Sequence, residues 1–364
     1  MKIAILSHMH HPIAEPFEGG TEAHTAMLAN ALVERGHDVT LFAKEGSVTS
    51  ATMYSLVPKD FEFIRKATPL VRIQQAGFLA EAVDHSINII HSSGFDVVVN
   101  NSLSSLPYIS MRDLPMLTIL HTPPTLSDVT AIVSDPDWVP SPLHEYVSVS
   151  ATNAEAWRAL LPRVGVVRNG IHLNQWSSPV RPTPGLAVWA ARITPEKGLH
   201  LAIDAARLAG LDIEFAGPIS HSDYFDAEVR PRLNQHVRYR GHLSHADLRG
   251  LFASGSVFIA SPTWAEPFGL TVVEALASGT PVAGLPNGAL PELIEPGAGV
   301  IATTTTAPAL AEAIRIAITR DRTQVVRSST RFSFDTMIDR YEEILECLAE
   351  KVPTHREDDQ MSVG

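Results

Sequence analysis

Residues 266–284 read "EPFGLTVVEALASGTPVAG" and place two carboxylates, Glu266 and Glu274, around a Pro-Phe-Gly-Leu step. The proline and glycine of that step are expected to keep Glu266 in a loop. The apolar residues that follow predict a helix and then a buried strand. One acid before a helix and one within it raise the question of what holds each carboxylate.

Glu274 has a structural explanation and a functional one. In the first, Thr271-x-x-Glu274 forms a capping box, in which both side chains satisfy free amides at the start of the helix. Glu274 would then lie in the first turn, where the helix dipole stabilises a carboxylate whether or not it binds anything. In the second, Glu266 and Glu274 both hold a ligand at the mouth of a cleft. Only Glu274 has the structural alternative.

Strand and helix patterns alternate outward from this stretch. The chain opens with the apolar run "KIAILSH", a helical stripe within "TEAHTAMLANALVERGHD" and a second run, "DVTLFAK". Later runs such as "DVVVNN", "MLTILHT", "YVSVSA" and "RVGVVRNG" are apolar on both faces, which indicates strands of a parallel sheet covered on both sides. After the Pro- and Ser-rich stretch "NQWSSPVRPTPG" the alternation restarts with "LAVWAARI". The pattern predicts an α/β fold of two tandem doubly wound, Rossmann-like domains.

The expected boundaries follow from the linker and from the end of the chain. The first domain is expected at residues 1–175, the linker at 176–184 and the second domain at 185–334. A long amphipathic helix is expected at 335–351, and the polar tail 352–364 is expected to be disordered. The length of 364 residues also suits two domains.

Composition excludes several classes of function. A net charge of −12 argues against a nucleic-acid partner, and it weakens without excluding transient association with anionic membranes. The single cysteine, Cys347, suits a reducing, cytoplasmic location. The N-terminal apolar run is too short for a signal peptide, and no stretch approaches the ~20 apolar residues of a membrane span.

Ligands of doubly wound sheets bind beyond the carboxyl ends of the strands, and two sets of residues stand there. Gly19 and Gly20 precede the first helix, where backbone amides and the helix dipole favour a phosphate, although a plain turn remains an alternative. Arg192 and Lys197 follow the first strand of the second series and suit a diphosphate, with a solvated surface pair as the alternative. The glycine pair is not a G-x-G-x-x-G fingerprint, which argues against a nicotinamide dehydrogenase, and the stretch of Arg192 and Lys197 is not a P-loop.

Histidines give weaker signals. His121 ends the strand "LTILH", and a buried structural histidine is as reasonable there as a functional one. His8, His10 and His11 crowd the first loop, but no H-E-x-x-H motif or carboxylate at ligand spacing accompanies them. We therefore expect neither a metal nor another cofactor.

On these motifs the chain resembles the retaining glycosyltransferases of the GT-B fold, family 4, also called glycosyltransferase group 1. The resemblance covers nearly the whole chain and is strongest in "GGTEAHTAMLANALVERGHDVTLFA", "RITPEKG", "FAGP" and the long segment 241–284. The last contains the E-x7-E element of the family. The resemblance implies two domains facing a central cleft, with the final helix packing back onto the N-terminal, acceptor-side domain.

The resemblance also implies roles for particular residues. Glu274 would hold the ribose of a nucleotide-sugar donor, and Glu266 would contact the transferred sugar, with His121 nearby. Arg192 and Lys197 would bind the diphosphate. The catalytic set is then Glu266, His121, Arg192 and Lys197. The donor-binding set is Gly19, Gly20, Arg192, Lys197, Gly217, Leu243, Phe268, Gly269, Leu270, Thr271 and Glu274.

Two departures from the family pattern leave contacts in doubt. The usual Asn-Gly-Val/Ile-Asp ends in His172 here, so any role of an acid at that position is lost. The usual Gly-Gly-x-Pro-Glu has one additional residue within segment 287–292, which puts a ligand contact by Glu292 in doubt. The run of threonines at 303–306 has no explanation from the sequence.

The sequence thus predicts a metal-independent enzyme that transfers a sugar from a nucleotide-diphosphate donor, with UDP favoured and GDP open, to an unidentified acceptor hydroxyl. Retention by front-face attack and by double displacement both remain open. Two alternatives also remain. One is a nucleotide-sugar epimerase or sugar phosphorylase on the same fold, and the other is a sensor that binds the donor without turnover.

Overall fold

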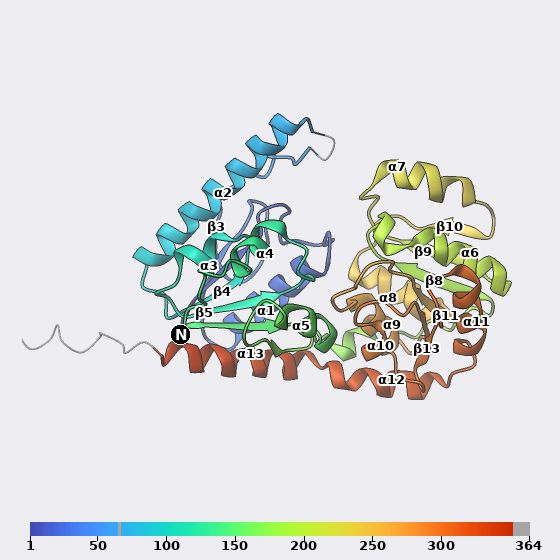
Figure 1. The fold of residues 1–364 in the computed structure, drawn as a ribbon. Coiled ribbons are helices and arrows are strands. Elements are labelled where there is room, and N and C mark those ends of the chain that lie inside the picture. Colours follow the sequence, from blue (N-terminus) through green and yellow to red (C-terminus); the bar gives the residue numbers. More distant parts are fainter. Residues whose placement is uncertain (65–66, 352–364) are drawn as a thin grey trace, which may run out of the picture.

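The computed structural model describes residues 1–64 and 67–351, and the predicted tail 352–364 lies outside this part of the chain. Two parallel sheets stand side by side in it, each flanked by helices (Figure 1). The first sheet has the order β3-β2-β1-β4-β5-β6-β7. Its strands are β1 (Lys2–Ser7), β2 (Asp38–Phe42), β3 (Thr52–Tyr54), β4 (Val97–Asn101), β5 (Met116–Leu120), β6 (His144–Ser148) and β7 (Gly165–Val166).

The second sheet repeats this arrangement with the order β10-β9-β8-β11-β12-β13. In both sheets the strand order reverses beside the first strand of the series, next to β1 and next to β8, which confirms the predicted doubly wound α/β fold. The strands are β8 (Leu186–Ala190), β9 (Asp212–Ala216), β10 (Val237–Tyr239), β11 (Val257–Ala260), β12 (Val282–Gly284) and β13 (Gly299–Ile301).

Helices cover both faces of each sheet because the strands bury alternate side chains on opposite sides. In β1, Ile3 and Ile5 enter one core cluster, and Ala4 and Leu6 enter another. The helices among residues 1–175 are α1 (Gly20–Glu34), α2 (Pro69–Ser92), α3 (Leu106–Ser110), α4 (Ser127–Val133) and α5 (Ala151–Arg158). Those that follow are α6 (Leu199–Ala209), α7 (Ser222–Tyr224), α8 (His245–Ser254), α9 (Leu270–Ala277), α10 (Leu290–Leu293), α11 (Ala307–Ala317), α12 (Arg322–Ser329) and α13 (Phe334–Ala349).

Helix α13 leaves the second sheet and runs along the first (Figure 1). It packs against α1, β4 and β5, with its apolar face, including Ile338 and Leu345, in the core. On its outer side Glu342 accepts a hydrogen bond from the Nε2 atom of His37 at 2.7 Å. Residues 176–184 lie between the two sheets in the sequence, and the division of the chain there stays a prediction.

Two segments differ from what the sequence suggests. The predicted strand in "RVGVVRNG" shortens to the two residues of β7, at the edge of the first sheet. The threonine run has a structural role at its end, because the Thr306 side chain caps α11 by accepting a hydrogen bond from the amide of Ala309.

Among residues 1–64 and 67–351, no helix combines the length and apolar character needed to cross a membrane.

Candidate functional site

A cavity of about 480 Å³ opens beyond the carboxyl ends of the strands of both sheets. It lies where doubly wound folds bind ligands, beside the points at which the strand order reverses. The structure brings every residue of the predicted site to this one cavity. Its lining includes Gly19, Gly20, His121, Arg192, Lys197, Gly217, Leu243, Glu266, Phe268, Gly269, Leu270, Thr271 and Glu274.

The two glycines let α1 approach the second sheet closely. A Cβ atom on Gly20 would lie 3.3 Å from Cδ1 of Leu270, the first residue of α9. One on Gly19 would lie 3.9 Å from Nε of Arg192. The start of α1 therefore faces the Arg192 side chain across the cavity, and free amides and a guanidinium together suit an anion.

The two predicted diphosphate-binding cations differ in that Lys197 already has an ionic partner. Nζ of Lys197 lies 2.6 Å from Oε2 of Glu266, and both side chains are largely buried. Within the described residues, no carboxylate pairs with the Arg192 guanidinium. Arg192 is therefore the cation most available to an incoming phosphate.

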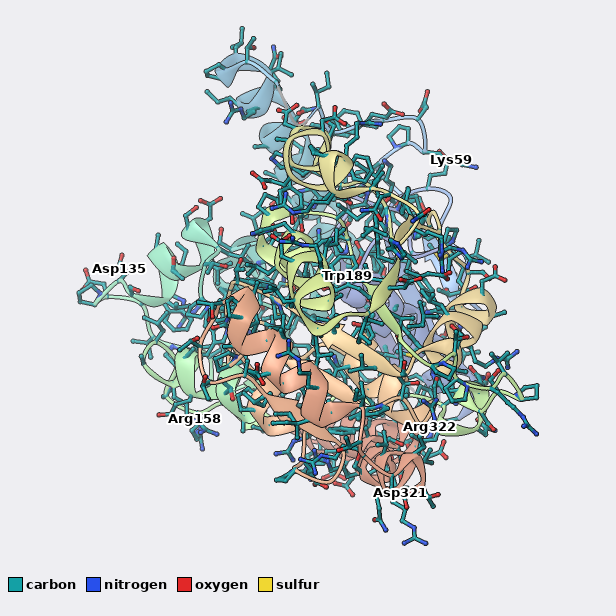
Figure 2. The ribbon with its side chains drawn as sticks, turned by 90° about the vertical axis from the view of Figure 1, so that its right-hand side faces the viewer. Lys59, Asp135, Arg158, Trp189, Asp321 and Arg322 are labelled. Atoms are coloured by element: carbon teal, nitrogen blue, oxygen red, sulfur yellow. The ribbon has the colours of Figure 1, made fainter. Side chains whose placement is uncertain are left out.

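Buried contacts behind the cavity fix the turn that carries Lys197. Trp189, near the middle of the side-chain view in Figure 2, is 2% exposed. Its indole donates to the Ser261 hydroxyl at 3.1 Å, and that hydroxyl donates to the carbonyl of Lys197 at 3.1 Å. Gly198 adopts φ +65°, and a Cβ there would lie 2.1 Å from the Ser261 carbonyl oxygen, so only glycine allows this close approach.

Glu266 is held in place by two donors. Besides Lys197, the indole Nε1 of Trp264 donates to Oε2 of Glu266 at 2.9 Å. The backbone of Glu266 is also supported, because its carbonyl accepts a hydrogen bond from the Ala289 amide at 2.8 Å. Gly288, with φ +58°, permits this contact, since a Cβ on it would lie 2.2 Å from the Glu266 backbone. The unusual segment 287–292 thus supports the loop of Glu266.

The capping-box explanation of Glu274 is wrong. Helix α9 begins at Leu270 after an N-cap at Gly269, whose φ of +105° favours glycine, and no side chain of the described residues caps it. Thr271 therefore lies inside the helix. The expected place of Glu274 in the first turn is wrong as well, because that turn contains no acid.

The Glu274 carboxyl instead borders the cavity. The residue is 7% exposed, and burial raises its pKa from 4.5 to about 8. No residue of the described ranges donates a hydrogen bond to its side chain. A buried carboxyl group without a donor is costly, and hydroxyl groups of a ligand would supply the missing donors.

The hydrogen bonds around His121 define which ring nitrogen carries the proton. Thr25 Oγ1 donates to the carbonyl of Thr21 and accepts from Nδ2 of Asn101 at 3.2 Å. Oδ1 of Asn101 then faces Nε2 of His121 at 3.3 Å, so Nε2 must be the donor. Burial, with smaller effects of His24 and His8, lowers the pKa of His121 well below its usual value. The ring is neutral and offers Nδ1 as an acceptor.

One histidine of the first loop, His8, lies beside a buried acid, Glu22. His8 Nε2 lies 3.3 Å from Oε1 of Glu22, and both side chains are buried. Burial opposes ionisation of Glu22, but the hydrogen bond and charge of His8 prevail and lower its pKa to about 2. Burial also lowers the pKa of His10 to about 4. Within the described part of the chain no three His, Cys, Asp or Glu side chains are grouped as metal ligands.

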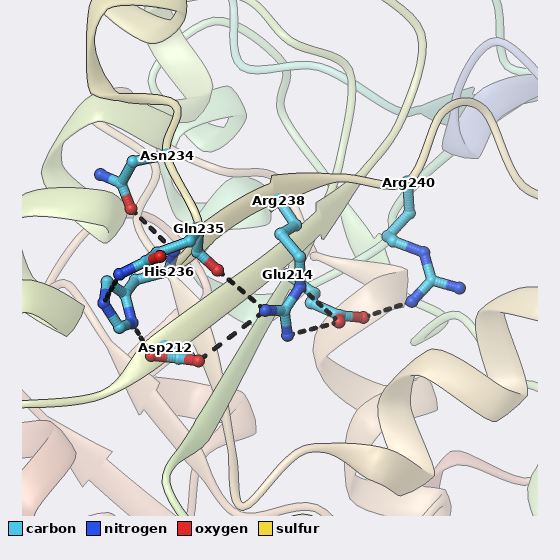
Figure 3. A network of polar contacts seen from close by, with 7 residues as sticks. All are labelled: Asp212, Glu214, Asn234, Gln235, His236, Arg238 and Arg240. Carbon is cyan, nitrogen blue, oxygen red and sulfur yellow. Dashed lines mark hydrogen bonds and ion pairs between the residues drawn. The ribbon is translucent and has the colours of Figure 1, made fainter.

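A polar network precedes Leu243, a residue of the predicted donor-binding set. Figure 3 shows Arg238 and Arg240 converging on Glu214, with distances of 2.9 and 2.6 Å to its two oxygens. Because Glu214 lies on β9 and the arginines lie on or next to β10, these bonds tie the edge strand to its neighbour. The chain then turns at Gly241, whose carbonyl accepts from the Gly217 amide at 2.9 Å, and reaches the cavity at Leu243.

Glu292, left in doubt by the sequence, lies away from the cavity lining. Its carboxylate caps α5 of the first sheet, accepting from the amides of Ala151 at 3.0 Å and Thr152 at 3.2 Å. It also pairs with Nε of Arg168 at 2.7 Å. Glu292 therefore connects the two sheets instead of contacting a ligand. The ring of His172 lies tilted against that of Phe334, with centroids 3.8 Å apart and an interplanar angle of 36°.

Sequence reasoning missed several cavity residues. Trp264 precedes the E-x7-E stretch without a pattern of its own, and Leu103 has an unusual φ of +59° that the sequence does not signal. Both line the cavity, as do His242 and His245. Glu22 also lines the cavity, close to the predicted glycine pair. The sequence does not show that this acid is buried, so it gave no reason to include Glu22 in the site.

Comparison with known proteins identifies relatives over almost the whole chain. The model of Glycosyltransferase Family 4 matches residues 18–175, and that of Glycosyl transferases group 1 matches residues 172–330. The glycogen synthase of Mycobacterium tuberculosis is 27% identical over 360 residues, covering 86% of this chain and 85% of the relative.

Solved structures show the same fold. The sucrose-phosphate synthase of Thermosynechococcus elongatus superposes with a TM-score of 0.78 at 17% identity, over 97% of this chain and all of that one. Anabaena Alr3699/HepE, solved in complex with UDP-glucose, gives a TM-score of 0.71 at 20% identity, over 95% of this chain and all of that one.

Proposed function

Because the chain belongs to the group 1, family 4 glycosyltransferases of the GT-B fold, we propose that it transfers a sugar from a nucleotide-diphosphate donor to an acceptor hydroxyl with retention of configuration. One observation carries the proposal. The cavity sets Arg192 opposite the amides of α1 and places the carboxyl of Glu274 in the same space, and neither side chain has an ionic or hydrogen-bond partner among the described residues. These groups suit the diphosphate and the ribose hydroxyls of one ligand.

The chemistry follows from where charge develops. Departure of the nucleotide leaves negative charge on the diphosphate and positive charge on the sugar ring, and preorganised groups stabilise both. Arg192, Lys197 and the amides at the starts of α1 and α9 face the diphosphate. Glu266, fixed by Lys197 and Trp264, would hold hydroxyl groups of the transferred sugar.

Retention suits front-face attack, in which the leaving phosphate accepts the proton of the acceptor hydroxyl. His121, neutral and donating from Nε2, would lie beside the sugar with Nδ1 as an acceptor. Arg192 and Lys197 supply the positive charge that a metal ion provides in metal-dependent enzymes, so we propose metal-independent transfer.

A UDP-sugar is the favoured donor, supported by the UDP-glucose complex of the Anabaena neighbour. The lone Cys347 supports a cytoplasmic location.

A donor screen followed by a turnover assay tests the proposal. UDP-, GDP- and ADP-sugars are compared by thermal shift, and the best donor is incubated with and without candidate acceptor sugars and polyols. Acceptor-dependent release of nucleotide supports transfer. Conversion of the donor sugar without an acceptor would indicate an epimerase, phosphate-dependent release a phosphorylase, and binding without any release a sensor.

The variant Arg192→Ala tests the assignment of the diphosphate. Loss of charge-assisted bonds worth roughly 1.5–3 kcal/mol should weaken nucleotide binding about ten- to a hundredfold. The matched control is Arg207→Ala, on the exposed last turn of α6. If Arg192→Ala and Arg207→Ala bind the nucleotide equally well, Arg192 does not bind the diphosphate.

A further inference from the structure

The last helix of the described chain approaches the neighbourhood of the cavity through the side chain of Tyr341. This residue lies on α13 and is 0% exposed. Its hydroxyl is 3.2 Å from Nε2 of His24 on α1, a contact that spans 317 positions of the sequence. The two rings also meet edge to face, with centroids 5.5 Å apart and an interplanar angle of 79°.

His24 carries this contact on to His121. It is 0% exposed, and its ring meets that of His121 at a centroid distance of 4.7 Å and an angle of 69°. Burial lowers the pKa of His24 to about 4, so the ring is neutral near neutral pH. Its Nδ1 atom has no hydrogen-bond partner in the described residues. The Tyr341 hydroxyl is therefore the polar contact that fixes the rotation of the His24 ring.

His121 is held from two sides. Asn101 accepts the Nε2 proton on one side, and the His24 ring supports the other. A buried ring that loses its hydrogen-bond partner has no water to replace it, so its orientation becomes poorly defined. Because the two rings are in contact, rotation of the His24 ring would also change the orientation of the His121 ring, which lines the cavity.

We propose that Tyr341 and His24 are positioning residues for His121, so that the C-terminal helix sets the geometry of the sugar-transfer step. The inference rests on the proposed function, in which His121 lies beside the donor sugar. It places Tyr341, far from the cavity lining in the sequence, among the residues that determine turnover. Neither Tyr341 nor His24 lines the cavity, so both act through His121.

The test removes one oxygen atom. In Tyr341→Phe the ring and its packing remain, and the His24 ring loses its partner. We expect kcat to fall about tenfold, since small displacements of a group beside the reacting atoms have effects of this size. The KM and the dissociation constant of the donor should stay unchanged, because the diphosphate and ribose contacts are untouched.

Tyr146→Phe is the matched control. Tyr146 is also buried, but its hydroxyl has no hydrogen-bond partner in the described residues and lies outside the cavity lining. Its loss should leave kcat unchanged. An unchanged kcat in folded Tyr341→Phe overturns the proposal, and so does an equal fall in both variants or a fall matched by a rise in donor KM.

A second variant and a spectroscopic readout complete the test. His24→Phe should lower kcat by a similar factor, and the double variant should lose no more than either single variant, because both changes break one chain of contacts. Additive losses overturn the proposal. Burial and the hydrogen bond to Asn101 should slow exchange of the His121 Nε2 proton with water. Nitrogen-15 NMR of the ring then detects this proton without turnover, so it tests the coupling of Tyr341 to His121 even if no nucleotide sugar is transferred. Loss of that signal in Tyr341→Phe is expected, and an unchanged signal overturns the coupling.

Discussion

The substitution Glu274→Gln tests whether the Glu274 carboxylate stabilises the fold or binds a ligand. The two roles predict opposite effects, because the pKa of Glu274 determines in which direction the free energy of unfolding changes. Burial raises the pKa of Glu274 from 4.5 to about 8. The unfolded chain therefore ionises this group at lower pH than the folded protein does. The contribution of protonated Glu274 to the stability of the folded protein is fully present below pH 4.5 and is lost as pH rises towards 8.

Glutamine keeps the shape of the protonated acid but never ionises. The variant should match wild type near pH 4.5 and become the more stable protein as pH rises, with the difference levelling off above pH 8. One pKa unit corresponds to about 1.4 kcal/mol, so the difference is on the order of 5 kcal/mol at most. Urea denaturation at pH 5, 7 and 8.5 measures it. A variant as stable as wild type at all three values would refute the reasoning.

Donor affinity should change in the opposite direction. Hydrogen bonds from ribose hydroxyls to a carboxylate contribute roughly 1.5–3 kcal/mol against about 1 kcal/mol for a neutral acceptor, so the ionised acid should bind about tenfold more tightly than glutamine. Binding then lowers the pKa of Glu274 by about one unit, and wild-type affinity should rise between pH 6.5 and 8.5. The variant controls for titration of the nucleotide itself. Equal dissociation constants at pH 8.5 would show that Glu274 does not contact the donor.

Three further predictions concern the rest of the site. Glu266→Gln should lower kcat by about ten- to a hundredfold with little change in nucleotide affinity, because its proposed partner is the sugar; a loss confined to binding would reverse that assignment. Activity should survive EDTA, and abolition with rescue by Mg²⁺ or Mn²⁺ would contradict the proposed charge stabilisation by Arg192 and Lys197. Glu292→Gln should lower the free energy of unfolding by about 1–2 kcal/mol, because a charged cap of α5 is lost. Exposed Glu295 supplies the control variant Glu295→Gln, and equal melts would show that the Glu292 contact contributes nothing.

The residues at strand ends could be predicted from the sequence because their neighbours in space follow from topology. His121 comes directly after β5, and Arg192 follows β8. Carboxyl ends of parallel strands meet at one edge of each sheet, so recognising the strands also predicts which polar residues gather there. The E-x7-E stretch adds a helix start to the same edge.

Contacts made by docking of distant elements could not be predicted in this way. Tyr341 contacts His24 only because α13 crosses back to α1. Glu292 caps α5 only because α10, which follows β12 of the second sheet, packs against the start of α5 beside the first sheet. Helix α2 gives a weak signal for another reason. Leu70 and Ile73 in its N-terminal part are 65% and 69% exposed, so its apolar residues do not follow a single buried stripe.

The two acids of the opening stretch show where local patterns fail and where chemistry remains informative. A Thr-x-x-Glu pattern does not specify which residue is the N-cap, and here the left-handed Gly269 starts the helix before Thr271 is reached. Glu266 has Lys197 and Trp264 as partners, so the fold itself accounts for its charge. Glu274 has no such partner in the described residues, and burial makes its ionisation unfavourable. A fold that keeps an acid where an amide would be more stable is explained if a ligand supplies the missing hydrogen bonds.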